Sequence, residues 1–160
     1  MLLYAAHGWG FADMPHGTIA VVKQICICAW DLDKAERAWN GILGIEGERI
    51  KTPPWTDVPS HTNGTPDAFD GVEFPVYHLA GGIALEIFGP GDGENPWHNF
   101  LKKHGEGAMN LAFFVPDREA AYGTIAETCR PKGPYHEGFC PGGTCAFVDT
   151  FQELGAIERP

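Results

Sequence analysis

One sequence pattern occurs twice in this chain, at a spacing of 86 residues. The segment VKQICICAWDLDKAERAW starts at Val22, and AMNLAFFVPDREAAYGTI starts at Ala108. Each copy is an apolar run that suits a strand, then an Asp that can cap a helix, then a helical segment. Each copy also carries one carboxamide at the head of its strand, Gln24 in the first and Asn110 in the second. This repeat constrains the chain to fold as two related halves and predicts a pseudo-twofold axis.

Both halves also contain one short motif, a small residue, an aliphatic residue and a glutamate near a proline. The two copies are Ala84-Leu85-Glu86 and Ala156-Ile157-Glu158. Each half therefore offers one amide and one carboxylate. The pattern predicts a four-residue site on the axis, made of Gln24, Glu86, Asn110 and Glu158.

The predicted elements run strand, helix and three strands in each half. Asp31 or Asp33 can cap the first helix, and Gly44 can end it. In the first half we expect strands at 18–29, 46–50, 74–80 and 83–88; in the second half, strands at 108–115, 134–136 and 144–149, a helix at 118–128 and a last strand up to Glu158. This order predicts an α+β fold in which two βαβββ modules pair into a curved sheet around a central cavity.

The boundaries of the parts follow from composition. We expect an irregular N-terminal arm at 1–17, a first βαβββ module at 18–90, and a linker helix with the second module at 91–160, together forming one domain. Residues 52–70 are rich in Pro, Gly, Asn and Thr and are expected to form a long loop. A loop of that length in a compact domain is more often functional or mobile than incidental.

Composition and charge limit the partners. The chain has 160 residues, 44% hydrophobic and 20% charged, which suits a soluble globular protein. A net charge of -10 opposes binding to nucleic acid or anionic membranes, and no stretch approaches the ~20 apolar residues of a membrane span. Five cysteines without zinc-site or disulfide-framework spacing fit a reducing compartment. We expect a cytoplasmic protein that binds a small molecule.

The order of four segments resembles the vicinal oxygen chelate superfamily, which includes glyoxalase I, methylmalonyl-CoA epimerase, extradiol dioxygenases and bleomycin-resistance proteins. The matching segments are CAWDLDKAERAWNGILGIEG, ALEIFGP, GEGAMNLAFFVPD and FVDTFQELGAIE, and they span most of residues 20–158. The resemblance implies a metal site at Gln24, Glu86, Asn110 and Glu158. It also implies a homodimer, with a cavity inside one chain or between exchanged modules.

The site positions follow the family pattern in part. The glyoxalase I order of Gln, Glu, His and Glu is matched at three positions and broken at Asn110, where the family usually has His. Methylmalonyl-CoA epimerase, with His at two of these places, is a poorer match at the site. An extradiol dioxygenase is disfavoured because its iron site needs two His.

Two chemistries are open at these positions. Glu86 lies in an apolar strand, so its carboxylate must be paired, metal-bound, protonated or exposed. Four oxygen donors favour Mg²⁺ or Mn²⁺, and the resemblance also allows Zn²⁺, Ni²⁺ or Co²⁺. Without a metal, Glu86 or Glu158 could act as a base with a raised pKa while the amides orient the substrate. His136, in the predicted loop GPYHEGF, is a further candidate acid or base.

These observations and the resemblance predict a glyoxalase-like enzyme. It would be an isomerase, epimerase or lyase that removes a proton next to a carbonyl of a hydrophobic or aromatic small molecule, with or without a metal ion. The alternative is a non-catalytic protein that sequesters a drug or metabolite, as bleomycin-resistance proteins do. Retention of both Glu86 and Glu158 favours the enzyme.

Overall fold

The computed structural model describes residues 2–6, 19, 21–53, 57, 59–67, 71–131, 134–140 and 143–154. They form ten strands and four helices. In chain order these are β1 (Leu2–Ala6), β2 (Val21–Cys28), α1 (Leu32–Leu43), β3 (Glu48–Lys51), β4 (His61–Thr62), β5 (Thr65–Pro66), β6 (Glu73–Leu79), β7 (Ile83–Phe88), α2 (Pro96–His104), β8 (Gly107–Val115), α3 (Arg118–Cys129), β9 (Pro134–Cys140), β10 (Gly143–Val148) and α4 (Phe151–Leu154). No helix among these residues is long and apolar enough to cross a membrane.

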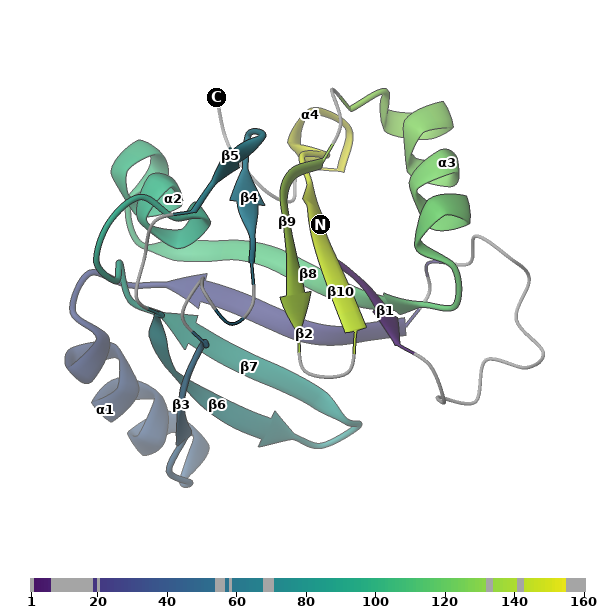
Figure 1. Cartoon of the computed structure of the whole chain (residues 1–160). Coiled ribbons are helices and arrows are strands. Elements are labelled where there is room, and N and C mark those ends of the chain that lie inside the picture. The colour runs from purple at the N-terminus through teal and green to yellow at the C-terminus, as the bar shows by residue number, and fades with distance from the viewer. Residues whose placement is uncertain are drawn as a thin grey trace.

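The ten strands belong to one sheet, in the order β3-β6-β7-β2-β8-β1-β10-β9-β4-β5 (Figure 1). Strand β2 runs parallel to β7 in the first half, and β8 runs parallel to β1 in the second. The antiparallel pair β2 and β8 joins the halves at the middle of the sheet. The predicted α+β class, with two modules that share a curved sheet, is confirmed.

The register of β2 and β8 places the local twofold axis. Ile25 pairs with Leu111 at the centre, and the flanking pairs are Gln24 with Ala112 and Cys26 with Asn110. Each residue of one flanking pair is equivalent to a residue of the other, 86 residues along the chain. The twofold axis therefore passes through the Ile25–Leu111 pair. A bulge interrupts the ladder on each side of this point, between Val22 and Gln24 and between Cys26 and Ile27. The sequence repeat is therefore a structural repeat.

Helices α1 and α3 repeat in the same way. Each has 12 residues, and each begins after an aspartate cap, Asp31 or Asp117, whose carboxylate accepts from the backbone N–H three residues on. Such capping satisfies one of the free N–H groups of the first turn. The first helix ends at Gly44 in the left-handed conformation, as its sequence predicts.

Alternation along the strands separates an inner from an outer face of the sheet. The outer faces pack against the two repeated helices: Leu85 and Ile87 lie under α1, and Val115 and Val148 lie under α3. The inner face carries a third cluster, to which helix α2 contributes Trp97, Phe100 and Leu101. The members from the sheet are Cys26, Cys28, Phe74, Val76, Phe88, Met109, Ala112, Cys145 and Phe147.

The N-terminal arm differs from its prediction. Residues 1–17 were expected to be irregular, but Leu2–Ala6 form strand β1, between β8 and β10. Because β1 runs parallel to β8 as β7 does to β2, it takes the fourth-strand place of the second module. The sequence assigned that place to a strand ending at Glu158, which lies outside the described residues. Residues Phe151–Leu154, which precede that segment, form helix α4.

The long loop predicted at 52–70 contains a small hairpin. Strands β4 and β5 are joined by Asn63 and Gly64, both with positive φ (52° and 76°), as a type I′ turn requires. Strand β4 then pairs with β9, so a segment of the first half extends the edge of the second (Figure 1). His61 is exposed and lies in β4.

Candidate functional site

Three predicted site residues lie on the inner face of the central strands. Glu86 on β7 and Asn110 on β8 both pair with Cys26, one from each side, so they share one row across the sheet. Gln24 precedes Cys26 by two residues and therefore points to the same face. Gln24 and Asn110 are both buried, as strand alternation predicts. The structure thus brings Gln24, Glu86 and Asn110 together.

Burial controls the ionisation of Glu86. Its carboxylate accepts a hydrogen bond from Nε2 of Gln24. Desolvation raises the pKa of Glu86 from 4.5 to about 7, and the Gln24 hydrogen bond offsets only part of that rise. A carboxyl group with this pKa exchanges its proton readily near neutrality, so Glu86 is suited to acid–base catalysis.

Asn110 carries a polar group without a described partner. Its side chain is only 4% exposed, and within the described residues neither its Oδ1 nor its Nδ2 forms a hydrogen bond. Buried amides are nearly always satisfied, so an exception in a folded protein requires an explanation. The Asn110 amide is available to a ligand group that reaches the inner face.

Cys26, beside Gln24, is not an activated nucleophile. Burial raises the pKa of the Cys26 thiol well above its ordinary value, and Cys28 adds to the rise, while a hydrogen bond with Trp97 opposes it. Cys28 is fully buried and lies 3.6 Å (Sγ to Sδ) from Met109. Since the thiolate is the nucleophilic form, Cys26 is kept unreactive near neutral pH.

Stacked aromatic rings form one wall of the inner face. The Phe74 and Phe88 ring centroids are 4.2 Å apart, and Phe88 stacks on Trp97 at 4.4 Å with ring planes 8° apart. Phe147 on β10 meets Trp97 edge-on at 6.3 Å. This wall gives the face an apolar, planar surface beside Glu86.

His136 lies in a buried polar cluster that we call the His136 cluster, made of Ser60, Thr62, Asp67 and His136. The histidine was expected where a short strand at 134–136 gives way to a loop, but β9 continues to Cys140, so His136 lies within the strand, opposite Thr62 of β4. Its Nδ1 is 2.9 Å from Thr62 Oγ1 and 3.4 Å from Asp67 Oδ2, and Ser60 donates to that carboxylate at 2.5 Å. All four residues are at most 8% exposed.

The pKa of His136 is lowered from 6.5 to about 4, because burial disfavours the charged ring more than Asp67 favours it. His136 is therefore neutral near pH 7, and its ring lies 4.8 Å from Phe147 and 6.2 Å from Trp97 between centroids. Sequence reasoning missed Ser60, Thr62 and Asp67. The Asn63-Gly64 dipeptide, a hairpin signal, was the cue that could have placed them in a structured segment.

The described donors do not fit the predicted metal site. Glu158 lies outside the described residues, and β1 holds the strand place expected for it. Cys26 and Ala112 are equivalent positions of the repeat, 86 residues apart. Glu86 pairs with Cys26, whereas Leu2 pairs with Ala112. A leucine therefore occupies the position at which the repeat predicts a second acid. No group of three or more His, Cys, Asp or Glu among the described residues is placed to hold a metal ion. One buried carboxylate leaves the charge of a divalent cation half neutralised.

Comparison with known proteins gives a fold. No family model and no curated protein matches this sequence. The structure is similar to a hypothetical protein of Bacillus halodurans C-125 (TM-score 0.58, 16% identity, covering 86% of this chain and 88% of the other). It is also similar to a variant of the methylmalonyl-CoA epimerase of Streptomyces coelicolor in complex with 2-nitronate-propionyl-CoA (TM-score 0.56, 17% identity, covering 88% of this chain and 94% of the other). The methylmalonyl-CoA epimerase of Mycobacterium tuberculosis is a third example (TM-score 0.54, 17% identity, covering 91% of this chain and 89% of the other).

The likeness covers nearly the whole length of both chains in each case. At this identity it establishes the architecture, whereas function has to be argued from the site. With its paired modules, its repeated helices and its inner-face row of polar residues, this chain has the fold of the vicinal oxygen chelate superfamily, as its sequence resemblance predicted.

Proposed function

We propose that this chain is an epimerase- or isomerase-like enzyme that moves a proton at a carbon next to a carbonyl group. The observation that carries the proposal is the buried carboxyl group of Glu86, with a pKa of about 7, on the inner face beside two carboxamides. A general base works best when its pKa lies near the working pH. Glu86 is the residue to which we assign the proton transfer.

The amides have separate roles in this mechanism. Gln24 donates to the Glu86 carboxylate and holds it in one orientation. As Glu86 takes the proton from the carbon, the electron pair of the C–H bond moves towards the carbonyl oxygen and forms an enolate. Asn110, whose amide lacks a described partner, can donate from Nδ2 to that oxygen as its charge develops. Return of the proton completes an isomerisation.

An epimerase also needs a group on the other face of the carbon. We assign this role to His136, which is neutral above pH about 4 and shares the inner face. In the tautomer with a proton on Nδ1, the ring donates to the Thr62 and Asp67 side and leaves Nε2 as the acceptor. Between pH 4 and 7, Glu86 is a protonated acid and His136 is a neutral base.

The substrate class follows from the wall of the site. Phe74, Phe88, Trp97 and Phe147 favour a hydrophobic or aromatic substrate. A cytoplasmic location and a homodimer stay proposals that come from the sequence. Two neighbours with this fold are methylmalonyl-CoA epimerases, so methylmalonyl-CoA is the first substrate to test.

The test follows solvent deuterium into the carbon next to the carbonyl. Purified protein in D₂O is incubated with methylmalonyl-CoA and with a set of aromatic 2-substituted carbonyl compounds, and the products are analysed by mass spectrometry. Loss of one general base typically lowers the rate about 10²–10⁴-fold, so we expect the rate of deuterium exchange by the Glu86→Gln variant to be lower than that of the wild type by this factor. Glu48→Gln, which changes an exposed carboxylate on edge strand β3, is the matched control.

The same experiment separates the enzyme from a sequestering protein. If the wild-type chain binds one of these compounds and exchanges no deuterium, the binding function replaces the catalytic one. If His136→Gln retains full exchange but loses inversion of configuration, the two-group assignment stands. Full epimerisation by that variant contradicts it.

A further inference from the structure

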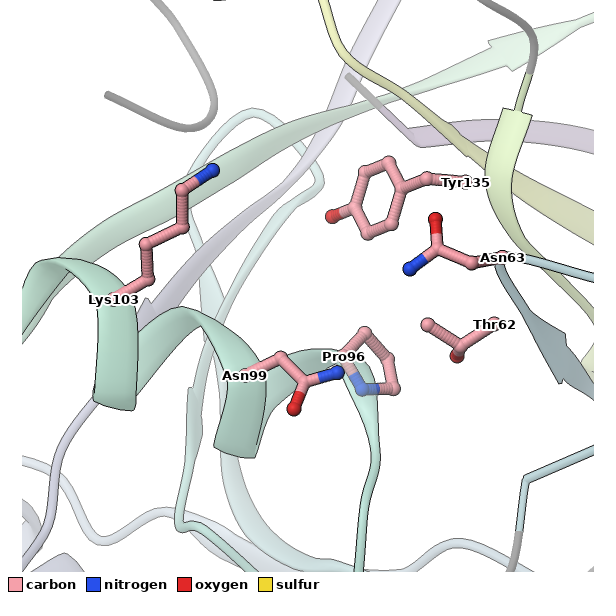
Figure 2. A pocket seen from close by; sticks show the side chains of 6 residues that line it. All are labelled: Thr62, Asn63, Pro96, Asn99, Lys103 and Tyr135. Atoms are coloured by element: carbon pink, nitrogen blue, oxygen red, sulfur yellow. The ribbon is translucent and has the colours of Figure 1, made fainter. Parts of the chain in front are cut away.

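The His136 cluster joins two parts of the chain that are far apart in sequence. Three of its members lie in or beside the β4–β5 hairpin, whereas His136 lies in β9 and pairs with Thr62 across the two strands. The next residue of the hairpin, Asn63, donates its backbone N–H to the carbonyl of Tyr135 at 2.6 Å, and Figure 2 shows these two residues side by side with Thr62 below them. The backbone therefore holds the hairpin against β9 at the position of His136.

Gly138 allows a close approach of the hairpin segment to β9. A Cβ at Gly138 would lie 3.1 Å from the Cβ of Ser60 and 3.5 Å from Nε2 of His136. The first distance is shorter than an ordinary contact of a Cβ atom, so a larger residue at this position would displace Ser60. The fold thus brings Ser60 directly over the strand that carries His136.

Two hydrogen bonds with Ser60 fix Asp67. The backbone N–H of Asp67 donates to the carbonyl of Ser60 at 3.0 Å, and the Ser60 hydroxyl donates to Oδ2 of Asp67. The Asp67 side chain is only 2% exposed, so its carboxylate does not turn out to solvent. Its Oδ2 therefore stays 3.4 Å from Nδ1 of His136.

The chemistry of the two partners of Nδ1 decides which tautomer His136 adopts. A carboxylate only accepts hydrogen bonds, so Asp67 favours a proton on Nδ1. The Thr62 hydroxyl lies 2.9 Å from Nδ1 and suits either tautomer, because a hydroxyl both donates and accepts. Of these two neighbours, only Asp67 distinguishes one tautomer from the other.

We propose that Asp67 is the positioning residue of His136: it keeps the proton on Nδ1 and so leaves Nε2 as the acceptor. When Nε2 takes up a proton, the ring becomes a cation, and the Asp67 carboxylate stabilises that charge. The catalytic consequence rests on the proposed function, in which His136 transfers a proton at the substrate carbon. The tautomer of His136 does not depend on that function.

NMR spectroscopy of the full chain, labelled with ¹⁵N-histidine, measures the tautomer directly. Long-range ¹H–¹⁵N correlations at pH 7 distinguish a protonated from an unprotonated ring nitrogen, and the signal missing from His136→Gln identifies the residue. We expect a proton on Nδ1 in the wild type and in Thr62→Val. We expect a mixture of tautomers, or a proton on Nε2, in Asp67→Asn, because its amide can donate to Nδ1.

The matched control is Glu137→Gln, the same acid-to-amide change on the neighbouring residue of β9. The Glu137 side chain is 49% exposed and points to the other face of the strand, so the tautomer of His136 should stay as in the wild type. A proton on Nε2 in the wild type overturns the proposal, and so does a changed tautomer in Thr62→Val. Neither outcome depends on the folding of Asp67→Asn. An unchanged tautomer in folded Asp67→Asn also overturns it.

The deuterium experiment measures the catalytic consequence. Asp67→Asn should exchange deuterium through Glu86 as the wild type does, but its rate of inversion should be about 10²–10⁴-fold lower, as for loss of a correctly oriented base. Inversion at the wild-type rate in Asp67→Asn overturns the positioning role. If the wild type exchanges no deuterium, the proposed function fails, and the NMR spectra alone decide whether Asp67 sets the tautomer.

Discussion

Glu86 couples its own ionisation to folding, because its carboxyl group has a pKa of about 7 in the folded chain and 4.5 as its ordinary value. Between these pH values the unfolded chain loses the proton and the folded chain keeps it. The contribution of Glu86 to stability is therefore fully present below pH 4.5 and is lost as pH rises through 7. The shift corresponds to at most about 3 kcal/mol of unfolding free energy.

We predict that Glu86→Gln removes this dependence. The wild-type unfolding free energy, measured by urea denaturation from about pH 4 to 8, should fall with rising pH relative to that of the variant. Glu48→Gln should leave the slope unchanged, because that side chain is exposed. Parallel curves for the wild type and Glu86→Gln would contradict the raised pKa.

His136 contributes a pH dependence of stability opposite in sign to that of Glu86. Its folded pKa of about 4 lies below its ordinary 6.5, so the unfolded chain takes up a proton first as the solution is acidified. Stability from this group is present above pH 6.5 and is lost as pH falls through 4. We expect His136→Gln to be less sensitive to acid than the wild type in the same denaturation series. A variant that keeps the wild-type acid slope would show that another group is responsible.

At the residue scale, the sequence repeat singled out Gln24, Glu86 and Asn110, which the structure places on the inner face of neighbouring strands; their role as a site stays a prediction. It did not locate Ser60, Thr62 and Asp67. Their roles depend on pairing between β4 and β9, which lie in different halves of the chain. No local pattern states which strand a two-residue segment will join.

At the scale of elements, the β4–β5 hairpin depends on the conformation of two residues. Gly64 has φ of 76°, and a Cβ there would meet no atom within 4 Å, so the cost of a side chain is conformational and not steric. We predict that Gly64→Ala destabilises the fold by about 1 kcal/mol.

Gly123 provides the matched control for that substitution. It lies inside α3, and a Cβ there would also meet nothing within 4 Å. Gly123→Ala should stabilise the fold by about 0.5–1 kcal/mol, since alanine favours a helix interior. Thermal unfolding measures both effects: the melting temperature should fall for Gly64→Ala and rise for Gly123→Ala. A stabilising Gly64→Ala would mean that the turn is not formed.

The helices and the hairpin illustrate what local sequence decides. Asp31, Asp117 and Gly44 mark the helix ends in the sequence and do so in the structure, because caps satisfy backbone groups within one turn. Strands were likewise predicted at 74–80 and 83–88, and in the structure they form the hairpin of β6 and β7, joined through Gly81 and Gly82, both of which have positive φ. Strand β9 was predicted too short, at 134–136, since its length reflects its partners β10 and β4.

At the scale of the whole molecule, the sheet depends on β1. This strand pairs with β8 on one side and β10 on the other, so its removal leaves two edges of the central sheet unpaired. We predict that deletion of residues 1–6 abolishes cooperative unfolding or lowers the melting temperature by roughly 10 °C or more, the size of shift that a loss of a few kcal/mol produces. Circular dichroism and thermal denaturation measure both.

Deletion of residues 155–160 is the control for that truncation. It removes the segment that the sequence assigned to the same strand place. A small effect of this deletion, with a large effect of the first, supports β1 as the fourth strand. The reverse result would show that the segment ending at Glu158 holds the place, and it would restore the second carboxylate to the inner face.

The sequence by itself determined the two halves, the register offset between them, the helix caps and the inward face of Gln24, Glu86 and Asn110. These features follow from periodicity and from contacts within a few residues, which every short segment carries in its own side chains. Tertiary structure alone decided that β1 fills the place beside β8 and that Thr62 meets His136. Two short segments, 2–6 and 156–158, suit the same strand place, and only the pairing of distant backbone groups chooses between them.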